Sequence, residues 1–257
     1  MGTQINKLDA LRESVRRLPH IVGPLDDHVI AEPAYPTDWT IAQVMSHLGS
    51  GAVILNGRLD DALAGAATAD EFAPQTWDAW NAKSPRSQVD DALVADAAFL
   101  AALEGLTDAE RGAFSFSLGP MTFDIDGFIG LRLNEHALHT WDIEVALEPT
   151  ATVPASIVEA VVDNLDLAAR FSARATDGGP ATVTIRTTDP ERRFIVAFTA
   201  DGATLESSTG TTGVIDLELS AESFARLVYG RLDVAHTPSF TGDPAVIDRL
   251  RATFPGM

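Results

Sequence analysis

Apolar residues recur every three to four positions through most of residues 1–147, a spacing typical of helices that bury one face. The pattern predicts long helices at about 8–30, 40–65, 87–105 and 126–147. Residues 65–86 are expected to form a loop with one short turn, in which Trp77 and Trp80 either line a pocket or, as the favoured role, cover the core. Residues 114–123 alternate and are expected to form a short hairpin or an extended crossover. Together these elements indicate a four-helix bundle.

The period changes after Pro154. One further helix is predicted at 155–175, and then alternating stretches predict strands at 181–187, 193–200, 203–208 and 214–219. Asp201-Gly202 joins two of these strands as a hairpin turn, and helices begin near 221 and 243. We therefore expect an α+β two-domain chain, with a helical bundle at 1–150 and an α+β domain with a mostly antiparallel sheet at 151–257.

Composition narrows the chemistry that is available to this fold. The chain has 257 residues, of which 46% are hydrophobic, and it contains no cysteine. A metal ion must therefore be held by His, Asp or Glu, and any thiol chemistry needs a thiol from outside the chain.

The formal net charge of −19 opposes binding to nucleic acid or to an anionic membrane surface. We identify neither an apolar secretory leader nor an apolar run of membrane-spanning length. The expectation is a soluble cytoplasmic protein, a monomer or small homo-oligomer, whose partners are small molecules.

The helix predicted at 126–147 carries two acidic residues on an otherwise apolar face. Its seam positions follow a spacing of three and four residues, at Phe128, Leu131, Glu135, Leu138, Asp142 and Val145. A carboxylate in a packed seam is costly unless a metal ion, a cation or several hydrogen bonds compensate it. His139 lies one turn after Glu135, so both side chains can point at the same spot.

His47, on the second predicted helix, can complete a three-ligand site with Glu135 and His139. Two imidazoles and one carboxylate suit zinc with an open coordination position, and they also suit non-haem ferrous iron. The small residues 49–51 lie just beyond His47, after Leu48. They either leave room for a bulky group or allow the helix to pack closely on a neighbour. Asp142 can orient a ligand imidazole from behind, or pair with an arginine in the core.

Other readings of the same residues remain open. Glu135 can form a buried ion pair with Arg132 or Arg58, in which case the histidines are incidental. His136 can chelate a metal together with His139, although it points about 100° away from Glu135 around the helix.

Arg231 closes a predicted helix in the second half of the chain. It either stabilises the helix C-terminus or binds an anionic ligand between the domains.

Several short motifs resemble those of the maleylpyruvate isomerase family of mycothiol-dependent enzymes, which are DinB-like metal-binding bundles. The motifs are Trp39-Thr40-Ile41, then His47-Leu48, then Glu135-x-x-x-His139-Thr140-Trp141-Asp142. The second half, with its strands and the Gly230-Arg231 helix end, is similar to the family's sterol-carrier-like C-terminal domain. The resemblance covers nearly the whole chain.

The resemblance implies a zinc ion held by His47, Glu135 and His139, with mycothiol as the thiol cofactor. In such enzymes the metal binds the thiol, which loses its proton and becomes a strong nucleophile at neutral pH. Addition to an electrophilic carbon, bond rotation and release give cis–trans isomerisation, whereas displacement of a leaving group gives S-transfer. Arg231 is the candidate for binding a carboxylate of the thiol or substrate.

Two other functions compete with a thiol-dependent isomerase or transferase. One is a non-catalytic binding module, with the bundle and the α+β domain as two walls of an apolar pocket that keeps its ligand when metal is removed. The other is a metal-dependent hydrolase that activates water, with Asp142 or His136 as the local candidate base.

Overall fold

The structure is a computed structural model that describes residues 6–35, 38–210 and 213–256. The chain divides into two compact units, Met1–Ala151 and Thr152–Met257, and each is described by itself. Within the described residues, no helix is both long and apolar enough to cross a membrane.

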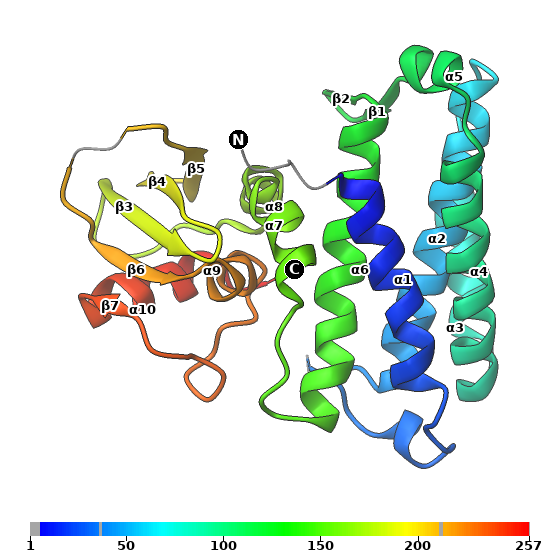
Figure 1. Ribbon diagram of the computed structural model, residues 1–257, viewed down its shortest axis with the longest axis horizontal. Coiled ribbons are helices and arrows are strands. Elements are labelled where there is room, and N and C mark those ends of the chain that lie inside the picture. The colour runs from blue at the N-terminus through cyan, green and yellow to red at the C-terminus, as the bar shows by residue number, and fades with distance from the viewer. Residues whose placement is uncertain (1–5, 36–37, 211–212, 257) are drawn as a thin grey trace. The chain divides into compact units, whose positions relative to one another are not determined.

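Four long helices pack side by side in the first unit (Figure 1). They are α1 (Lys7–Val22), α2 (Ile41–Leu63), α4 (Pro85–Gly105) and α6 (Ile125–Leu147). Helix α2 packs against α4 and α6, while α1 packs against α6 and α4. The connections carry η1 (Val29–Ala31), α3 (Phe72–Asn81), α5 (Asp108–Ala113) and the hairpin of β1 (Phe116–Leu118) with β2 (Met121–Phe123). The predicted four-helix bundle and the hairpin are therefore confirmed.

The helix that carries His47 begins at a well-defined position. The Thr40 hydroxyl accepts a hydrogen bond from the backbone N–H of Gln43, and the Gln43 side chain accepts one from the backbone N–H of Thr40. This reciprocal capping satisfies two N–H groups at the start of α2. It fixes the residue at which α2 begins, and therefore how far along the helix His47 lies.

Helix α6 departs from the single buried seam that the spacing predicted. Leu131 and Glu135 are only half-buried, whereas Arg132, Asn134 and His136 are buried. The prediction of a single seam is wrong at these positions. Helices α1 and α2 both pack on α6, so residues outside the predicted seam are buried as well.

Several predicted boundaries also need correction. The first helix ends at Val22 rather than near residue 30, because Gly23-Pro24 interrupts it, although Pro19 is accommodated inside. The expected loop at 65–86 contains the ten-residue helix α3. The helix expected at 155–175 is two shorter helices, α7 (Ala155–Val162) and α8 (Leu165–Ser172).

The second unit is a five-stranded sheet with helices. The strand order is β5-β4-β3-β6-β7, and every neighbouring pair is antiparallel except β3 with β6. The strands are β3 (Ala181–Thr188), β4 (Arg192–Phe198), β5 (Ala203–Ser207), β6 (Leu217–Ser220) and β7 (Thr241–Gly242), and the remaining helices are α9 (Ala221–Val228) and α10 (Pro244–Thr253). This confirms the α+β class and the mostly antiparallel sheet. The strand expected at 214–219 begins only at Leu217.

The Gly49→Ala substitution is expected to lower the free energy of unfolding by roughly 1–3 kcal/mol, the usual cost of overpacking a core. A Cβ atom at Gly49 would lie 2.2 Å from the Trp80 ring and 2.9 Å from Cα of Ala92. Urea denaturation measures the effect. In the control Gly112→Ala the new methyl group meets no atom within 4 Å, so stability should not fall. Equal stability of both variants would contradict the close packing of α2 on α3 and α4.

Candidate metal centre

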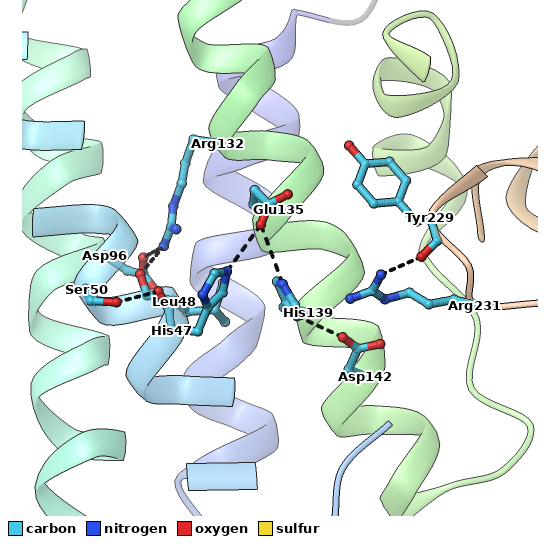
Figure 2. Close-up of polar contacts among 10 residues, drawn as sticks. All are labelled: His47, Leu48, Ser50, Asp96, Arg132, Glu135, His139, Asp142, Tyr229 and Arg231. Atoms are coloured by element: carbon cyan, nitrogen blue, oxygen red, sulfur yellow. Dashed lines mark hydrogen bonds and ion pairs between the residues drawn. The ribbon is translucent and has the colours of Figure 1, made fainter. Parts of the chain in front are cut away.

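His47 from α2 and Glu135 and His139 from α6 converge on one spot (Figure 2). Oε2 of Glu135 lies 3.2 Å from Nε2 of His47 and 3.5 Å from Nε2 of His139. One potential ligand atom from each residue lies within 4.8 Å of the others. The structure therefore brings together all three residues of the predicted metal site.

Trp39 packs against both histidines of this group. Its ring centroid lies 5.3 Å from that of His47 and 6.0 Å from that of His139, and the two imidazole centroids are 4.6 Å apart. These aromatic contacts restrict how far either imidazole can turn. The sequence analysis included Trp39 in a family motif but gave it no role at the site. The signal that could have identified this role is its position just before the start of α2.

Asp142 lies behind His139. Its carboxylate is fully buried, and Oδ2 is 2.8 Å from Nδ1 of His139. A carboxylate in this position selects the tautomer of a ligand imidazole and fixes its ring, so that Nε2 is left for the ligand side. This contact matches the orienting role that was predicted for Asp142, and the role itself stays a prediction.

The electrostatic surroundings of His47 and Glu135 favour the protonation states that bind a metal. Burial lowers the pKa of His47, against the opposing effect of its hydrogen bond with Glu135. Burial also raises the pKa of Glu135, but hydrogen bonds with His139 and His47 outweigh it and hold this pKa well below its usual range. At neutral pH the protein therefore presents a neutral imidazole at His47 and a carboxylate at Glu135. These are the protonation states that coordinate a divalent ion.

His136 does not share this site, so the alternative in which it chelates with His139 is wrong. It is fully buried, with Nδ1 2.7 Å from Oγ of Ser14 and Nε2 3.2 Å from Oδ2 of Asp96. Both ring nitrogens are therefore engaged by protein groups. The same burial removes His136 as a base for a hydrolase.

Neither arginine proposed as an ion-pair partner of Glu135 takes that role. Arg132 is buried and pairs with Asp96, and its Nη2 also donates to the Leu48 carbonyl at 2.9 Å. The guanidinium of Arg58 lies over the Phe116 ring, 5.7 Å from its centroid. Glu135 is instead engaged by the two histidines.

Asp96, from α4, is the centre of a polar cluster that the sequence reading missed. Burial raises the pKa of this carboxyl, but the charges of Arg132 and His136 outweigh burial and lower it. The available signal was its spacing, since it lies between Leu93 and Leu100 on the buried face of α4. Through Arg132 the cluster also reaches Leu48, the residue after His47, and so fixes α2 against α6.

The three small residues after His47 serve close packing. Gly49 lies against Trp80, and a Cβ atom at Gly51 would lie 3.0 Å from Nη1 of Arg132. The Ser50 hydroxyl donates to the His47 carbonyl at 3.0 Å. Of the two explanations offered by the sequence, close packing on a neighbour accounts for Gly49 and Gly51.

Arg231 lies in the second unit, just after α9. It is 8% exposed, and Nη1 donates to the carbonyl of Tyr229, the C-cap residue of α9, at 2.7 Å. A cation at this position stabilises the negative end of a helix. This is one of the two roles that were predicted for Arg231.

A sequence model described as the mycothiol maleylpyruvate isomerase N-terminal domain matches residues 11–144. Among solved structures, the chain is similar to that of the mycothiol-dependent maleylpyruvate isomerase, at 14% identity and a TM-score of 0.64, with 88% of each chain covered. A variant of that enzyme in which one histidine is replaced by alanine matches with the same values. No curated protein matches the sequence significantly. At this identity the structural likeness shows the shared fold.

The Asp96→Ala substitution is expected to destabilise the protein by roughly 3–5 kcal/mol, because it leaves Arg132 buried without its carboxylate. Urea denaturation at pH 7 measures the loss. The control is Asp91→Ala on the same helix, where the carboxylate is 53% exposed and pairs with Lys83, so the loss should stay below about 1 kcal/mol.

The pH dependence gives a second check on Asp96. Its pKa is lowered in the folded state, so its stabilising effect is present above the ordinary value of 3.8 and is lost as pH falls through the lower folded value. The difference in unfolding free energy between the wild type and Asp96→Asn should therefore become smaller as the pH falls below 3.8. A gap that is constant with pH would contradict a charged Asp96.

Proposed function

Because the chain belongs to the family of the mycothiol maleylpyruvate isomerase N-terminal domain, we propose that it is a mycothiol-dependent enzyme with a divalent metal, zinc, in its first unit. Its reaction is isomerisation, or alternatively S-transfer, on a small electrophilic substrate. The observation that carries the proposal is the convergence of His47, Glu135 and His139 inside the segment that matches the family. The related solved structures are those of a maleylpyruvate isomerase, and maleylpyruvate is therefore the first substrate to test.

The residues present fit a zinc ion. Two imidazole nitrogens and one carboxylate oxygen are donors that zinc prefers, and three protein ligands leave a coordination position open. The side chains of His47 and Glu135 are 35% and 34% exposed, so the open side can receive a small molecule. When bound, the metal would lower the pKa of an incoming thiol and supply a thiolate at neutral pH.

The chain's own residues prepare this site in three ways. Glu135 holds a negative charge between two imidazoles, and this charge favours a divalent cation there. Asp142 fixes the orientation of His139 through Nδ1. Trp39 packs against both imidazoles and limits how far the rings can turn.

Arg231 completes the proposal as the residue that binds a carboxylate of thiol or substrate. Its guanidinium is planar and always charged, and is well suited to a carboxylate. We also propose a cytoplasmic location, where small thiols are kept in their reduced form.

The alanine variants of His47, Glu135 and His139 are each expected to lose the metal. Purified wild-type protein should contain about one zinc per chain, as a three-ligand site requires, measured by metal mass spectrometry. The matched control is Glu148→Gln, which changes an exposed carboxylate next to the C-terminus of α6 and should keep full occupancy. Full zinc content in the Glu135 and His139 variants would overturn the site.

Asp142→Asn tests the orienting contact separately, because it removes no ligand. Loss of such a partner typically weakens metal affinity by about 10–100-fold. Competition with a chelator measures this affinity. An unchanged affinity would show that the contact between Asp142 and His139 does not support metal binding.

Turnover of maleylpyruvate is expected to require both zinc and mycothiol. The zinc-loaded protein, the metal-free protein and the zinc-loaded protein without thiol are compared by chromatography of the products. Product formed with water alone would favour the hydrolase, and binding of maleylpyruvate without turnover, unaffected by metal removal, would favour the binding module. An S-linked product in place of the trans isomer would favour the transferase.

A further inference from the structure

A pocket of about 540 Å³ lies beside the C-terminal end of α2 in the first unit. It is lined by the last turns of α2, the connection at 65–70, the first turn of α3 and residues 115–119. The hairpin of β1 and β2 lies at this end of the bundle, and β1 contacts α2 (Figure 1). Arg58 in the lining follows His47 by eleven residues, which corresponds to about 16 Å along a helix. The pocket is therefore separate from the metal group, with which its described lining shares no residue.

Arg58 is a half-buried cation in this lining that lacks an acidic partner. In the same unit Arg17, Arg86 and Arg132 each pair with a carboxylate. Among the described residues, the Arg58 guanidinium forms neither a hydrogen bond nor an ion pair, although the chain has 37 acidic and only 18 basic side chains. Burial lowers the pKa of Arg58, and no carboxylate in the described part of the chain offsets this effect. An anion from outside the chain would supply the missing counter-charge.

Phe116 holds the Arg58 guanidinium in place. The guanidinium lies over the Phe116 ring, 5.7 Å from its centroid. This ring is itself fixed in the core, since it is 9% exposed and its centroid lies 6.3 Å from that of Phe123 and 5.1 Å from that of Phe128. A guanidinium over a ring face keeps its N–H groups as hydrogen-bond donors. Arg58 can therefore meet a carboxylate with two parallel hydrogen bonds.

Further hydrogen-bond donors lie in the same lining. The hydroxyls of Thr68 and Ser115 have no hydrogen-bond partner among the described residues. The backbone N–H groups of residues 67–70 likewise donate to no acceptor in the described part of the chain. These groups can satisfy the acceptor oxygens of an anion that lies against Arg58.

The remaining lining limits both the charge and the shape of a ligand. Asp70 is the other charged residue of the described lining, so a second negative charge on the ligand would be repelled. A carboxylate carries one charge, whereas a phosphate monoester carries nearly two. Small or apolar side chains form much of the wall and leave room for an apolar body, at Ala62, Ala66, Ala67, Ala69, Ala73 and Leu118.

We propose that this pocket is a second ligand site, which binds a small monocarboxylate with an apolar body. The carboxylate lies against Arg58 and accepts hydrogen bonds from the neighbouring hydroxyl and N–H groups. The apolar body packs on the alanine-lined wall, where its burial adds to the affinity. The inference is independent of the proposed function, because it involves none of the candidate metal ligands.

The test measures the binding of phenylacetate to the full-length protein by calorimetry. Phenylacetamide keeps the ring but is neutral, and acetate keeps the charge but lacks the ring. The wild type is expected to bind phenylacetate with a Kd of about 1 mM or lower. Each comparison compound should bind at least about tenfold more weakly, because it loses either the charge-assisted hydrogen bonds or the apolar contact.

Arg58→Gln removes the cation and keeps a side chain of similar polarity. It should weaken phenylacetate binding about tenfold or more and remove the preference over phenylacetamide, whereas Arg58→Lys should keep part of both. The matched control is Arg16→Gln, the same change of charge at an exposed arginine of α1, which should bind phenylacetate as the wild type does. Circular dichroism checks that the variants are folded.

Asp70→Asn changes the charge of the pocket in the opposite direction. Because Asp70 is exposed, the substitution should leave the fold intact. Loss of the repelling charge should strengthen phenylacetate binding about two- to threefold at low salt, and it should leave phenylacetamide binding unchanged.

The absence of phenylacetate binding to the wild type would overturn the inference. An affinity that Arg58→Gln leaves unchanged would also overturn it, and this is the result expected if the carboxylate binds at the metal instead. If Arg58→Gln does not fold, Asp70→Asn decides, and an unchanged affinity in that variant has the same meaning. Failure of the proposed function looks different, because zinc content and turnover of maleylpyruvate do not depend on Arg58.

Discussion

The first unit depends on one buried ionic cluster, in which the carboxylate of Asp96 faces Arg132 and His136 with almost no access to solvent. A charge in such a place is stable only while its partners are present, so α4 and α6 have a single favourable register. The bond from Arg132 to the Leu48 carbonyl extends this constraint to α2. Since His47 precedes Leu48, the position of one candidate ligand relative to the other two follows from a contact outside the site.

Helix α6 carries residues that stabilise the bundle and, next to them, residues of the candidate site. Arg132 and His136 are buried and hold the bundle together, whereas the half-exposed Glu135 and the buried His139 carry the candidate site. Neighbouring residues on α6 therefore do different work. A metal site on a rigid pair of helices keeps its geometry better than one on loops.

Much of the fold and of the candidate site could be predicted from the sequence, because helical spacing is a local property. The four long helices, the approach of Glu135 to His139 one turn later, and the family resemblance all followed from local patterns, and the family is confirmed by the match to residues 11–144. The partner of Arg132 could not be predicted, because Asp96 is distant in sequence and only packing selects it. Helix α3 was missed because it is short and contains Pro74, and because its position depends on Trp80 fitting against Gly49.

The close fit at Gly49 and Gly51 has a consequence for how such a protein can change over time. At Gly49 and Gly51 helix α2 has no room for larger side chains, so substitutions at these two positions disturb the packing around them. Helix α3 presents Trp77, Asp78 and Asn81 to a groove beside His47 and, among the described residues, contributes none of the candidate metal ligands. The residues that line this side of the groove can thus diversify by exchange of one short helix, while the three candidate metal ligands stay unchanged.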